Sequence, residues 1–348
     1  MLPFFDGHND TLLALLENPE RGFGDAQGVG HIDVKRAREG GFAGGLFAMF
    51  TPADGGLAAL ATPKGNGVRA PHGPVDPNHA LQKTLHMFAL LRRLEAAGEL
   101  RVCTSADEVE NAMREGVIAA VPHIEGAEAI TDLSVLEALH ALGLRSLGLT
   151  WSRPNAFATG VPFAFPASPD IGTGLTAAGH ALVEACDALR IVVDVSHLNE
   201  AGFWDVVKTS TRPFVASHSN VHAVCASTRN LTDAQLDALA ERDGLVGLNF
   251  AVAFLREDGK HEADTPLETM VRHLDYMVER VGEDRVALGS DFDGATIPQA
   301  IGDVAGVPKL ADALRAHGWS EALLEKVWRG NWMALLRRVQ EDEVGGRA

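Results

Sequence analysis

The sequence predicts an α/β protein with a (β/α)8 TIM-barrel fold and extra helices near its C-terminal end. Short apolar runs alternate with longer segments of helical period, the apolar runs number eight, and most are continuous, as buried parallel strands require. A doubly wound sheet is the alternative, but no glycine-rich nucleotide loop follows the first run. We therefore expect a single barrel domain over 1–348, with the barrel at about 1–295 and the C-terminal helices at about 308–340.

The expected elements follow in chain order. The apolar runs predict strands at 2–6, 45–50, 117–124, 146–150, 191–195, 214–217, 245–250 and 286–289. Helical periodicity predicts helices at 78–97, 105–115, 134–142, 176–189, 201–209, 232–242, 266–281, 309–317 and 321–340. Ser105 and Thr232 can cap the helices that they begin. Two segments rich in proline and glycine, 51–77 and 152–174, follow strand ends, where a barrel carries its substrate loops.

Composition narrows the class of protein. The chain has 46% hydrophobic and 22% charged residues, which is typical of a packed globular protein. Its formal net charge of −17 disfavours nucleic acids and anionic membrane surfaces as partners. Three cysteines, an odd number without CxxC spacing, indicate a reducing compartment. Because no signal-peptide pattern and no apolar run of about 18 residues is evident, we expect a cytoplasmic protein.

Side chains that can bind metal follow several of the predicted strands. The first strand leads into His8 and Asp10, which are two residues apart and point to the same side of an extended backbone. Together they can offer an imidazole nitrogen and a carboxylate to one cation. An HxD pair alone is a weak signal, because most such pairs bind no metal.

Four further strand ends carry histidine or an acidic residue. They are Glu125, His197, His218 and Asp291. A carboxylate at the end of an apolar strand is costly to bury unless a cation or a donor meets it. The C-terminal ends of barrel strands meet at one rim, so five such strand ends together predict a single polar site.

This set fits two divalent cations that share one carboxylate. One ion would take His8, Asp10 and an oxygen of Glu125, and the second would take the other oxygen with His197 and His218. Mixed nitrogen and oxygen ligands suit Zn²⁺, with Mn, Fe or Co possible. Two such ions about 3.5–4 Å apart would polarise a carbonyl and convert a bridging water to hydroxide, with Asp291 as the base. The expected chemistry is hydrolysis.

The residues also carry a resemblance to the membrane (renal) dipeptidase family of zinc peptidases. The matching stretches are DGHND at 6–10, IEGAE at 124–128, VDVSH at 193–197, SHSNVHAVCASTRN at 217–230, LTDAQL at 231–236, GSDFDG at 289–294 and WSEALLEKVWRGNW at 319–332. The resemblance implies the barrel, a dinuclear zinc site and hydrolysis of L-Xaa-L-Xaa or L-Xaa-D-Xaa dipeptides. It implies the same metal ligands, Asp291 as the acid/base and Arg229 as the group that binds the terminal carboxylate of the substrate. The family is often dimeric, so a homodimer is possible.

One position departs from the family pattern. Trp151 stands where the mammalian enzymes carry a histidine that contacts the substrate, and an indole has one N–H donor and no acceptor. It can form a wall of the site or donate to a carbonyl. Arg153 or Asn155 could supply a replacement donor, and we count Trp151 and Asn155 among the expected substrate-binding residues.

Two other functions remain open at this point. The same metals could serve a hydrolase of another carbonyl substrate, such as a lactone, an ester or an N-acyl amino acid, because fold and metals do not determine the substrate. The chain could also be a non-catalytic metal-binding barrel, although Asp291 beside an open site argues against this.

Overall fold

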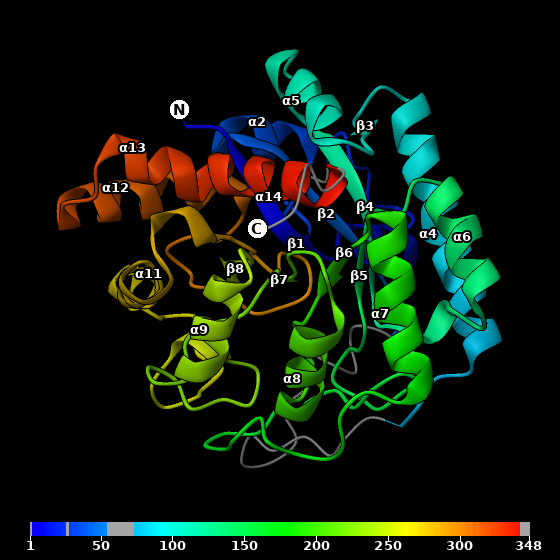
Figure 1. The fold of residues 1–348 in the computed structure, drawn as a ribbon. Helices are drawn as coiled ribbons and strands as arrows, with labels where there is room; N and C mark the ends of the chain where they lie inside the picture. Colours follow the sequence, from blue (N-terminus) through cyan, green and yellow to red (C-terminus); the bar gives the residue numbers. More distant parts are fainter. Residues whose placement is uncertain (1, 26–27, 54–72, 342–348) are drawn as a thin grey trace.

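A closed barrel of eight parallel strands forms the centre of the computed structural model, which describes residues 2–25, 28–53 and 73–341 (Figure 1). The strands are β1 (Phe4–Asn9), β2 (Phe42–Phe50), β3 (Arg101–Val102), β4 (Ala119–Glu125), β5 (Ser146–Gly148), β6 (Val192–Asp194), β7 (Val215–Ala216), β8 (Leu245–Leu248) and β9 (Val286–Leu288). Neighbours pair in the order β2-β1-β9-β8-β7-β6-β5-β4, and pairing of β2 with β4 closes the barrel. β3 lies outside it, because it pairs with β4 alone.

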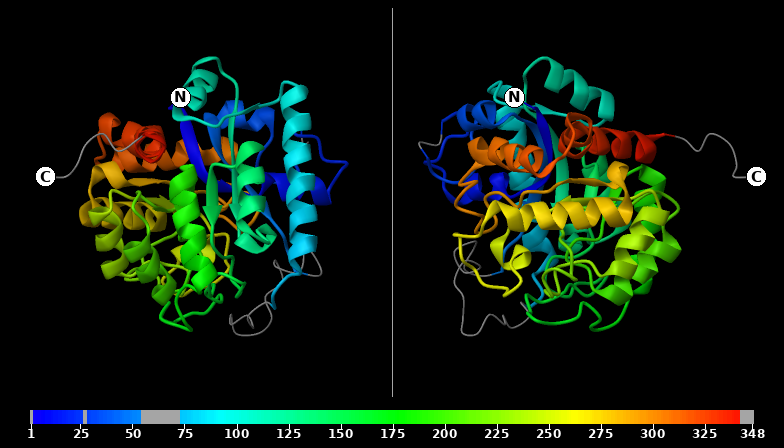
Figure 2. Two further views of the ribbon diagram at one scale, coloured as in Figure 1. Left: turned by 45° about the vertical axis from the view of Figure 1, so that its right-hand side comes forward. Right: turned by 90° about the vertical axis from the view of Figure 1, so that its left-hand side faces the viewer.

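Helices surround the barrel on its outer side (Figures 1 and 2). They are α1 (Thr11–Glu17), α2 (Val34–Gly40), α4 (Pro77–Ala96), α5 (Ala106–Arg114), α6 (Leu133–Ala141), α7 (Ala177–Leu189), α8 (Glu200–Thr209), α9 (Asp233–Glu241), α10 (Val252–Leu255), α11 (Leu267–Val281), α12 (Val307–His317), α13 (Glu321–Glu325) and α14 (Asn331–Gln340). Short 3₁₀ segments lie at η1 (Ala127–Ala129), η2 (Glu283–Arg285) and η3 (Val304–Gly306), and a π-helical segment, η4 (Lys326–Gly330), joins α13 to α14.

The predicted barrel is confirmed, and each predicted strand and helix has a counterpart in the structure. The expected caps at Ser105 and Thr232 are present, and Thr232 forms a capping box with Gln235. The prediction missed α1, α2, α10 and β3, because elements of two to seven residues give too little periodicity to detect. The helix expected at 321–340 is interrupted by the π-helical segment.

The two ends of the barrel differ in what covers them. Helix α14 lies across one end, and its Trp332 and Leu336 pack in one apolar cluster with Phe5, Leu46 and Val215 of the strands. Loops leave the opposite end, to which the strands point with their C-terminal residues. We call these ends the base and the rim.

The loop expected at 152–174 lies at the rim and contains no helix, whereas most of the loop expected at 51–77 lies outside the described residues. Over the described ranges, none of the helices has the length and apolar character needed to cross a membrane.

Candidate active site

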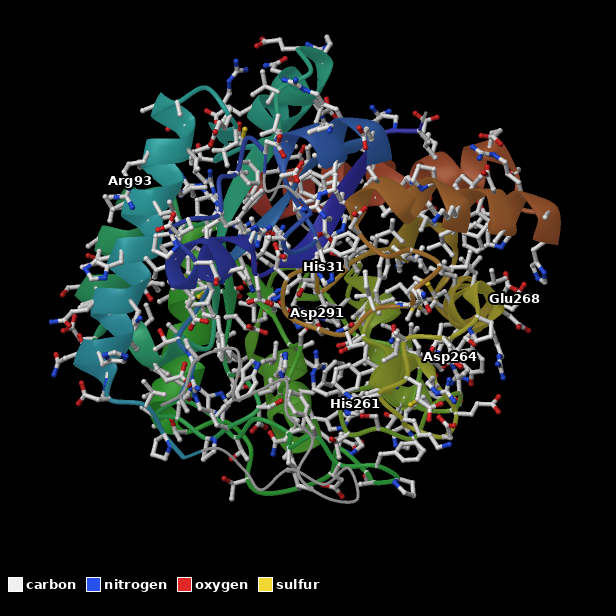
Figure 3. The ribbon with its side chains drawn as sticks, turned by 180° about the vertical axis from the view of Figure 1, so that it is seen from behind. His31, Arg93, His261, Asp264, Glu268 and Asp291 are labelled. Atoms are coloured by element: carbon white, nitrogen blue, oxygen red, sulfur yellow. The ribbon has the colours of Figure 1, made fainter. Side chains whose placement is uncertain are left out.

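The six side chains expected at the rim come together there. His8 lies in β1, Asp10 follows it, and Glu125 is the last residue of β4. His197, His218 and Asp291 follow the ends of β6, β7 and β9 by two or three residues. Five of the six are buried and Asp291 is partly exposed. Asp291 lies near the middle of the molecule when the structure is viewed from behind (Figure 3).

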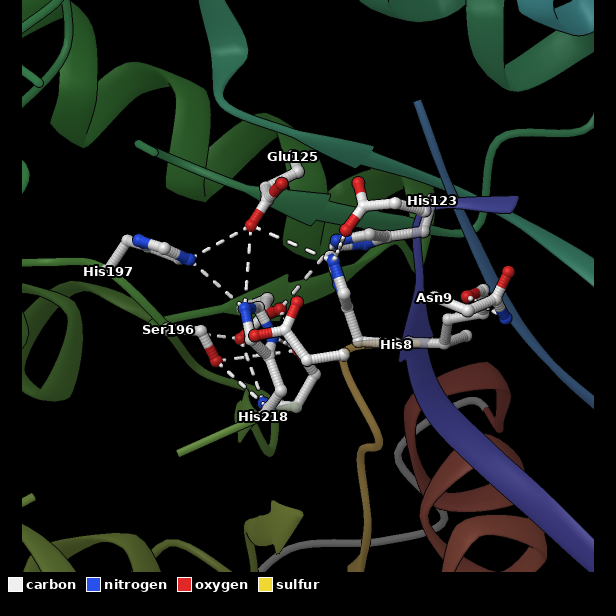
Figure 4. A network of polar contacts seen from close by, with 12 residues as sticks. His8, Asn9, His123, Glu125, Ser196, His197 and His218 are labelled. Carbon is white, nitrogen blue, oxygen red and sulfur yellow. Dashed lines mark hydrogen bonds and ion pairs between the residues drawn. The ribbon is translucent and has the colours of Figure 1, made fainter. Parts of the chain in front are cut away.

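Glu125 is at the centre of the group (Figure 4). Its Oε1 lies 3.0 Å from Nε2 of His197, 3.4 Å from Nε2 of His218 and 3.8 Å from Nε2 of His8. The Nε2 atoms of the first two are 3.1 Å apart. Three imidazoles therefore direct nitrogens toward one carboxylate oxygen, as the ligands of a shared metal centre would.

A second group lies beside the first. His8 Nε2 is 3.5 Å from Asp10 Oδ2, and ligand atoms of His8, Asp10 and Asp291 lie within 4.8 Å of one another. The same spacing holds for His8, Glu125 and His218. The two groups share His8, so the side chains are arranged as two adjoining sets of nitrogen and oxygen donors.

The donor atoms fit divalent cations because several of them are buried without a partner. In the described part of the chain, His8 Nδ1, His8 Nε2 and Asp10 Oδ1 accept or donate no hydrogen bond. Buried polar atoms are normally paired, and an unpaired group costs about 1–3 kcal/mol. The Nε2 atoms of His197 and His218 also face each other, and both could bind the same cation.

The electrostatics of the group favour added positive charge. Desolvation raises the pKa of Glu125 to about 8 and raises the pKa of Asp291 above its usual value. Desolvation alone would lower the pKa of His8, but the carboxylates around it, led by Glu125, raise it to about 10. Burial lowers the pKa values of His197 and His218 well below the usual range, which keeps both rings neutral and able to bind metal.

Hydrogen bonds on the far side of two rings orient them. His197 Nδ1 lies 2.7 Å from Ser152 Oγ, and His218 Nδ1 lies 2.8 Å from Ser217 Oγ. The hydroxyl of Ser217 donates in turn to Asp194. When Nδ1 carries the hydrogen and donates to serine, Nε2 presents its lone pair to the site, which is how outer groups fix a metal-binding tautomer.

Strained backbone brings two of these residues inward. His197 has φ 67° and Asp291 has φ 61°, a left-handed conformation that non-glycine residues rarely adopt. Asp6 supports the second of them, because its carboxylate accepts from the backbone N–H and the hydroxyl of Ser290, both at 2.7 Å. These bonds tie β1 to the end of β9, so His8 and Asp291 are held relative to each other.

Arg229 lies beside the group, as expected. Its Nη2 donates to the backbone carbonyl of His218 at 3.0 Å, and its guanidinium stacks over Phe254 with 5.4 Å to the ring centroid. Its Nε–H is buried and has no hydrogen-bond partner among the described residues. Desolvation lowers its pKa to about 10, so the cation is retained near neutral pH.

Trp151 forms part of an aromatic wall. Its ring centroid lies 5.0 Å from that of Phe50, 5.4 Å from that of Phe163 and 5.9 Å from that of His197. Arg153, suggested above as a replacement donor, is fully buried and binds Glu128 at 2.6 Å and the carbonyl of Thr51 at 2.7 Å.

Asn155 is occupied by its own loop. Its Nδ2 donates to Leu149 O at 2.7 Å, and its Oδ1 accepts from the backbone N–H groups of Phe157 and Ala158. These bonds hold the loop that follows β5, so the amide is already committed to backbone partners.

Asp293 has a larger role than the sequence indicated. Its carboxylate accepts from both terminal nitrogens of Arg21, at 3.2 and 3.1 Å, from Thr11 at 3.0 Å and from the backbone N–H of His31 at 2.7 Å. The loop after β9 is thus tied to the segment before α2. Periodicity could not reveal this, because the partners lie more than 260 residues away; only the unusual GSDFDG run marked the position.

A parallel barrel whose rim gathers imidazoles and carboxylates that could bind cations is typical of metal-dependent hydrolases. The sequence model described as "Membrane dipeptidase (Peptidase family M19)" matches residues 1–345. The chain belongs to this family and is a metallo-dipeptidase, so the class expected from the sequence is confirmed.

The chain is also similar to individual proteins. A metallo peptidase from Rhodobacter sphaeroides, solved with a phosphinate mimic of the dipeptide L-Ala-D-Ala, is 49% identical, covers 97% of this chain and 99% of its own, and superposes with a TM-score of 0.92. A Klebsiella pneumoniae protein named only for its place in the pqqA 5′ region is 49% identical over 77% of this chain and 99% of its own length. Dipeptidase 3 of Mus musculus is 26% identical over 97% of this chain and 65% of its own length.

Proposed function

We propose that the site binds two Zn²⁺ ions and hydrolyses dipeptides with a free terminal carboxylate, both L-Xaa-L-Xaa and L-Xaa-D-Xaa. The observation that carries the proposal is the convergence of three imidazole nitrogens on Glu125 Oε1, at 3.0, 3.4 and 3.8 Å. Nitrogen and oxygen donors in this mixture suit zinc, and Mn, Fe or Co would fit the same donors.

The donor atoms divide between two ions. His8, Asp10 and one oxygen of Glu125 would hold the first ion, and the other oxygen with His197 and His218 would hold the second. The close approach of His8 to Asp10, and of His197 to His218, supports pairing the histidines in this way, although all three rings lie nearest the same oxygen of Glu125, Oε1. Two such cations, when bound, would polarise the scissile carbonyl and lower the pKa of the attacking water.

Asp291 is proposed to move the proton. It adjoins His8 and Asp10, and desolvation raises the pKa of its carboxyl, which favours acceptance of a proton. Its carboxylate would take a proton from the attacking water and return it to the amine that leaves when the peptide bond breaks. Glu125 takes part as the shared ligand rather than as a second base.

Arg229 is proposed to bind the terminal carboxylate of the substrate. Its buried Nε–H needs an acceptor, and a guanidinium can hold a carboxylate through two parallel bonds. Trp151 would then form a wall beside the scissile bond, since its ring adjoins His197. Asn155 would act less directly, because its amide supports the loop that carries Trp151 and Arg153.

We propose that the site accepts either an L- or a D-residue at the second position of the dipeptide. Support for a D-residue comes from the Rhodobacter enzyme, which was solved with a mimic of L-Ala-D-Ala and is 49% identical over 97% of this chain. A short substrate is also supported by the position of Arg229, because its Nη2 donates to the backbone carbonyl of His218 at 3.0 Å and the guanidinium therefore lies next to a proposed metal ligand.

The test is turnover of L-Ala-L-Ala and L-Ala-D-Ala, each as the free acid and as the C-terminal amide, with metal-stripped protein as the control. We expect cleavage of the free acids only. The metal-stripped protein should be inactive and should regain activity when zinc is added, and elemental analysis of the active protein should find about two zinc ions per chain. Equal cleavage of acid and amide would contradict the role of Arg229. Cleavage of lactones or N-acyl amino acids in place of dipeptides would contradict the proposed substrate.

We also propose a cytoplasmic location and a homodimer. All three cysteines are buried and unpaired, which supports the cytoplasmic location expected from the sequence. A homodimer remains a prediction from the family resemblance, to be tested by light scattering of the purified protein.

A further inference from the structure

A buried asparagine stands at the end of β8, beside the proposed acid/base. Asn249 directly follows the apolar run Leu245–Leu248 and is completely buried. A buried amide is costly unless its donors and acceptors are paired. The partners of Asn249 therefore indicate why a polar residue ends this strand.

The amide of Asn249 is bonded on both sides. Its Oδ1 accepts from the backbone N–H of Ala251 at 2.7 Å. Its Nδ2 donates to Asp291 Oδ2 at 2.9 Å and lies 3.3 Å from the carbonyl of His218. Since Ala251 N–H can only donate, the oxygen must face it, and the NH₂ group must face Asp291.

The backbone of Asn249 is fixed as well. Its N–H donates to Asn220 Oδ1, and its carbonyl accepts from Asn220 Nδ2, both at 2.9 Å. Asn220 belongs to the loop after β7 that also carries His218. The donor that meets Asp291 is thus held by two neighbouring strands and cannot easily turn away.

Among the residues that the structure describes, Asn249 alone donates a hydrogen bond to the carboxylate of Asp291. The terminal torsion of an aspartate is soft, and its backbone is already in a strained conformation at φ 61°. With Oδ2 held by Asn249, Oδ1 points to the side of Gly294, where an added Cβ would lie 2.8 Å from Oδ1 and 2.0 Å from Asp10 Oδ2. Glycine at 294 keeps that space open.

We propose that Asn249 is a positioning residue for the hydrolysis, which holds Asp291 Oδ2 so that Oδ1 faces the attacking water. This inference rests on the proposed role of Asp291. Asn249 itself touches neither the substrate nor the reacting atoms, so its effect passes through the aspartate.

The test compares Asn249→Ala and Asn249→Asp with Asn331→Ala. The aspartate variant keeps the shape and the bond to Ala251 but removes the donor and places a second carboxylate against Asp291. Asn331 is a matched control, because it is also buried and its Nδ2 donates to two backbone carbonyls, Glu283 O and Val286 O, at the base.

We expect both Asn249 variants to lower kcat by about 10- to 100-fold with KM within about threefold and with metal content unchanged. Asn331→Ala should lower the melting temperature and leave kcat unchanged. In a double-mutant cycle, Asn249→Ala added to Asp291→Ala should cause no further loss. That result would show that the amide acts through the aspartate.

Other results would overturn the inference. Wild-type kcat in either folded Asn249 variant would do so, as would equal losses of kcat and bound metal, which would assign Asn249 to the metal site. A further loss in the Asp291→Ala background would mean that it acts elsewhere. Wild-type turnover is measured before any variant is made. If the wild-type protein cleaves no dipeptide, the proposed function is wrong, and this result is distinct from a failure of the role proposed for Asn249.

Discussion

Trp332 at the base and His8 at the rim are both completely buried, yet their polar atoms differ in whether they have a hydrogen-bond partner. The indole N–H of Trp332 donates to Leu288 O at 3.1 Å, and its ring fills the space left by Gly7, where an added Cβ would lie 2.5 Å from it. The nitrogens of His8 have no hydrogen-bond partner within the described residues. The paired and well-packed indole of Trp332 contributes stability, whereas the imidazole of His8 has nitrogens left to bind a ligand.

The largest expected effect is at the centre of the rim. Glu125→Gln keeps the shape of the side chain but removes the charge that three imidazoles face. Turnover should fall by about 1,000-fold or more, and the metal content should fall with it. The melting temperature of the metal-free variant should stay near that of metal-free wild type, as measured by circular dichroism. A stable variant with full metal content and normal turnover would contradict the role of Glu125 as a metal ligand.

The base should show the opposite response. Trp332→Ala would leave a large cavity under the strands and should lower the free energy of unfolding by about 3–5 kcal/mol in urea titrations. Turnover per folded molecule should stay within about threefold of wild type. Trp319 is only partly buried and its indole N–H donates to Asp275 at 2.7 Å, so Trp319→Ala is the matched control and should lower the free energy of unfolding by less. Turnover that falls in step with stability would mean that base and rim are not separate.

A third test concerns the substrate side of the rim. Arg229→Lys keeps a positive charge but loses the planar fork that grips a carboxylate. We expect kcat/KM for a free dipeptide to fall by about 10- to 100-fold, mainly through KM. The ratio of rates for the free dipeptide and its C-terminal amide should fall toward one. An unchanged ratio would place the carboxylate elsewhere.

Strand ends made much of the rim predictable. His8, Glu125, His197, His218 and Asp291 follow apolar runs, and a parallel barrel brings all such positions to one end. Adding the family motifs then gave each residue a role. The base was harder to predict. Helical periodicity indicated a helix near the C-terminal end of the chain, but it did not indicate which end of the barrel this helix covers.

The supporting contacts could not be predicted, because they join distant segments through single side chains. In the sequence Asn249 is a polar residue inside the strand predicted at 245–250, and its role depends on the position of Asp291, 42 residues later in the chain. The sequence alone assigns no role to Asp293, although its carboxylate binds Arg21 across 272 residues. Pairings of this kind follow from loop conformation, which carries no periodic signal.

The smallest expected effect tests whether a satisfied histidine at the rim is only structural. His273 of α11 lies fully buried between rim loops, where Nδ1 accepts from Val221 N–H at 3.2 Å and Nε2 lies 2.9 Å from Leu255 O. Burial lowers the pKa of His273 to about 4, so its imidazole stays neutral in the folded protein at pH values where the same ring in the unfolded chain, with a pKa near 6.5, takes up a proton. Its contribution to stability is therefore present above pH 6.5 and is lost as the pH falls toward 4.

His273→Gln should remove that dependence and leave the active site unaffected. Between pH 7 and pH 4.5, the free energy of unfolding of wild type should fall more than that of the variant, by on the order of 2 kcal/mol, in paired urea titrations of metal-free protein. Turnover at pH 7 should be unchanged, as it should be for His180→Gln, which removes an imidazole from the outer helix α7. Loss of turnover in His273→Gln alone would show that hydrogen-bond satisfaction does not separate structural from functional histidines at this rim, because both nitrogens of His273 are already paired.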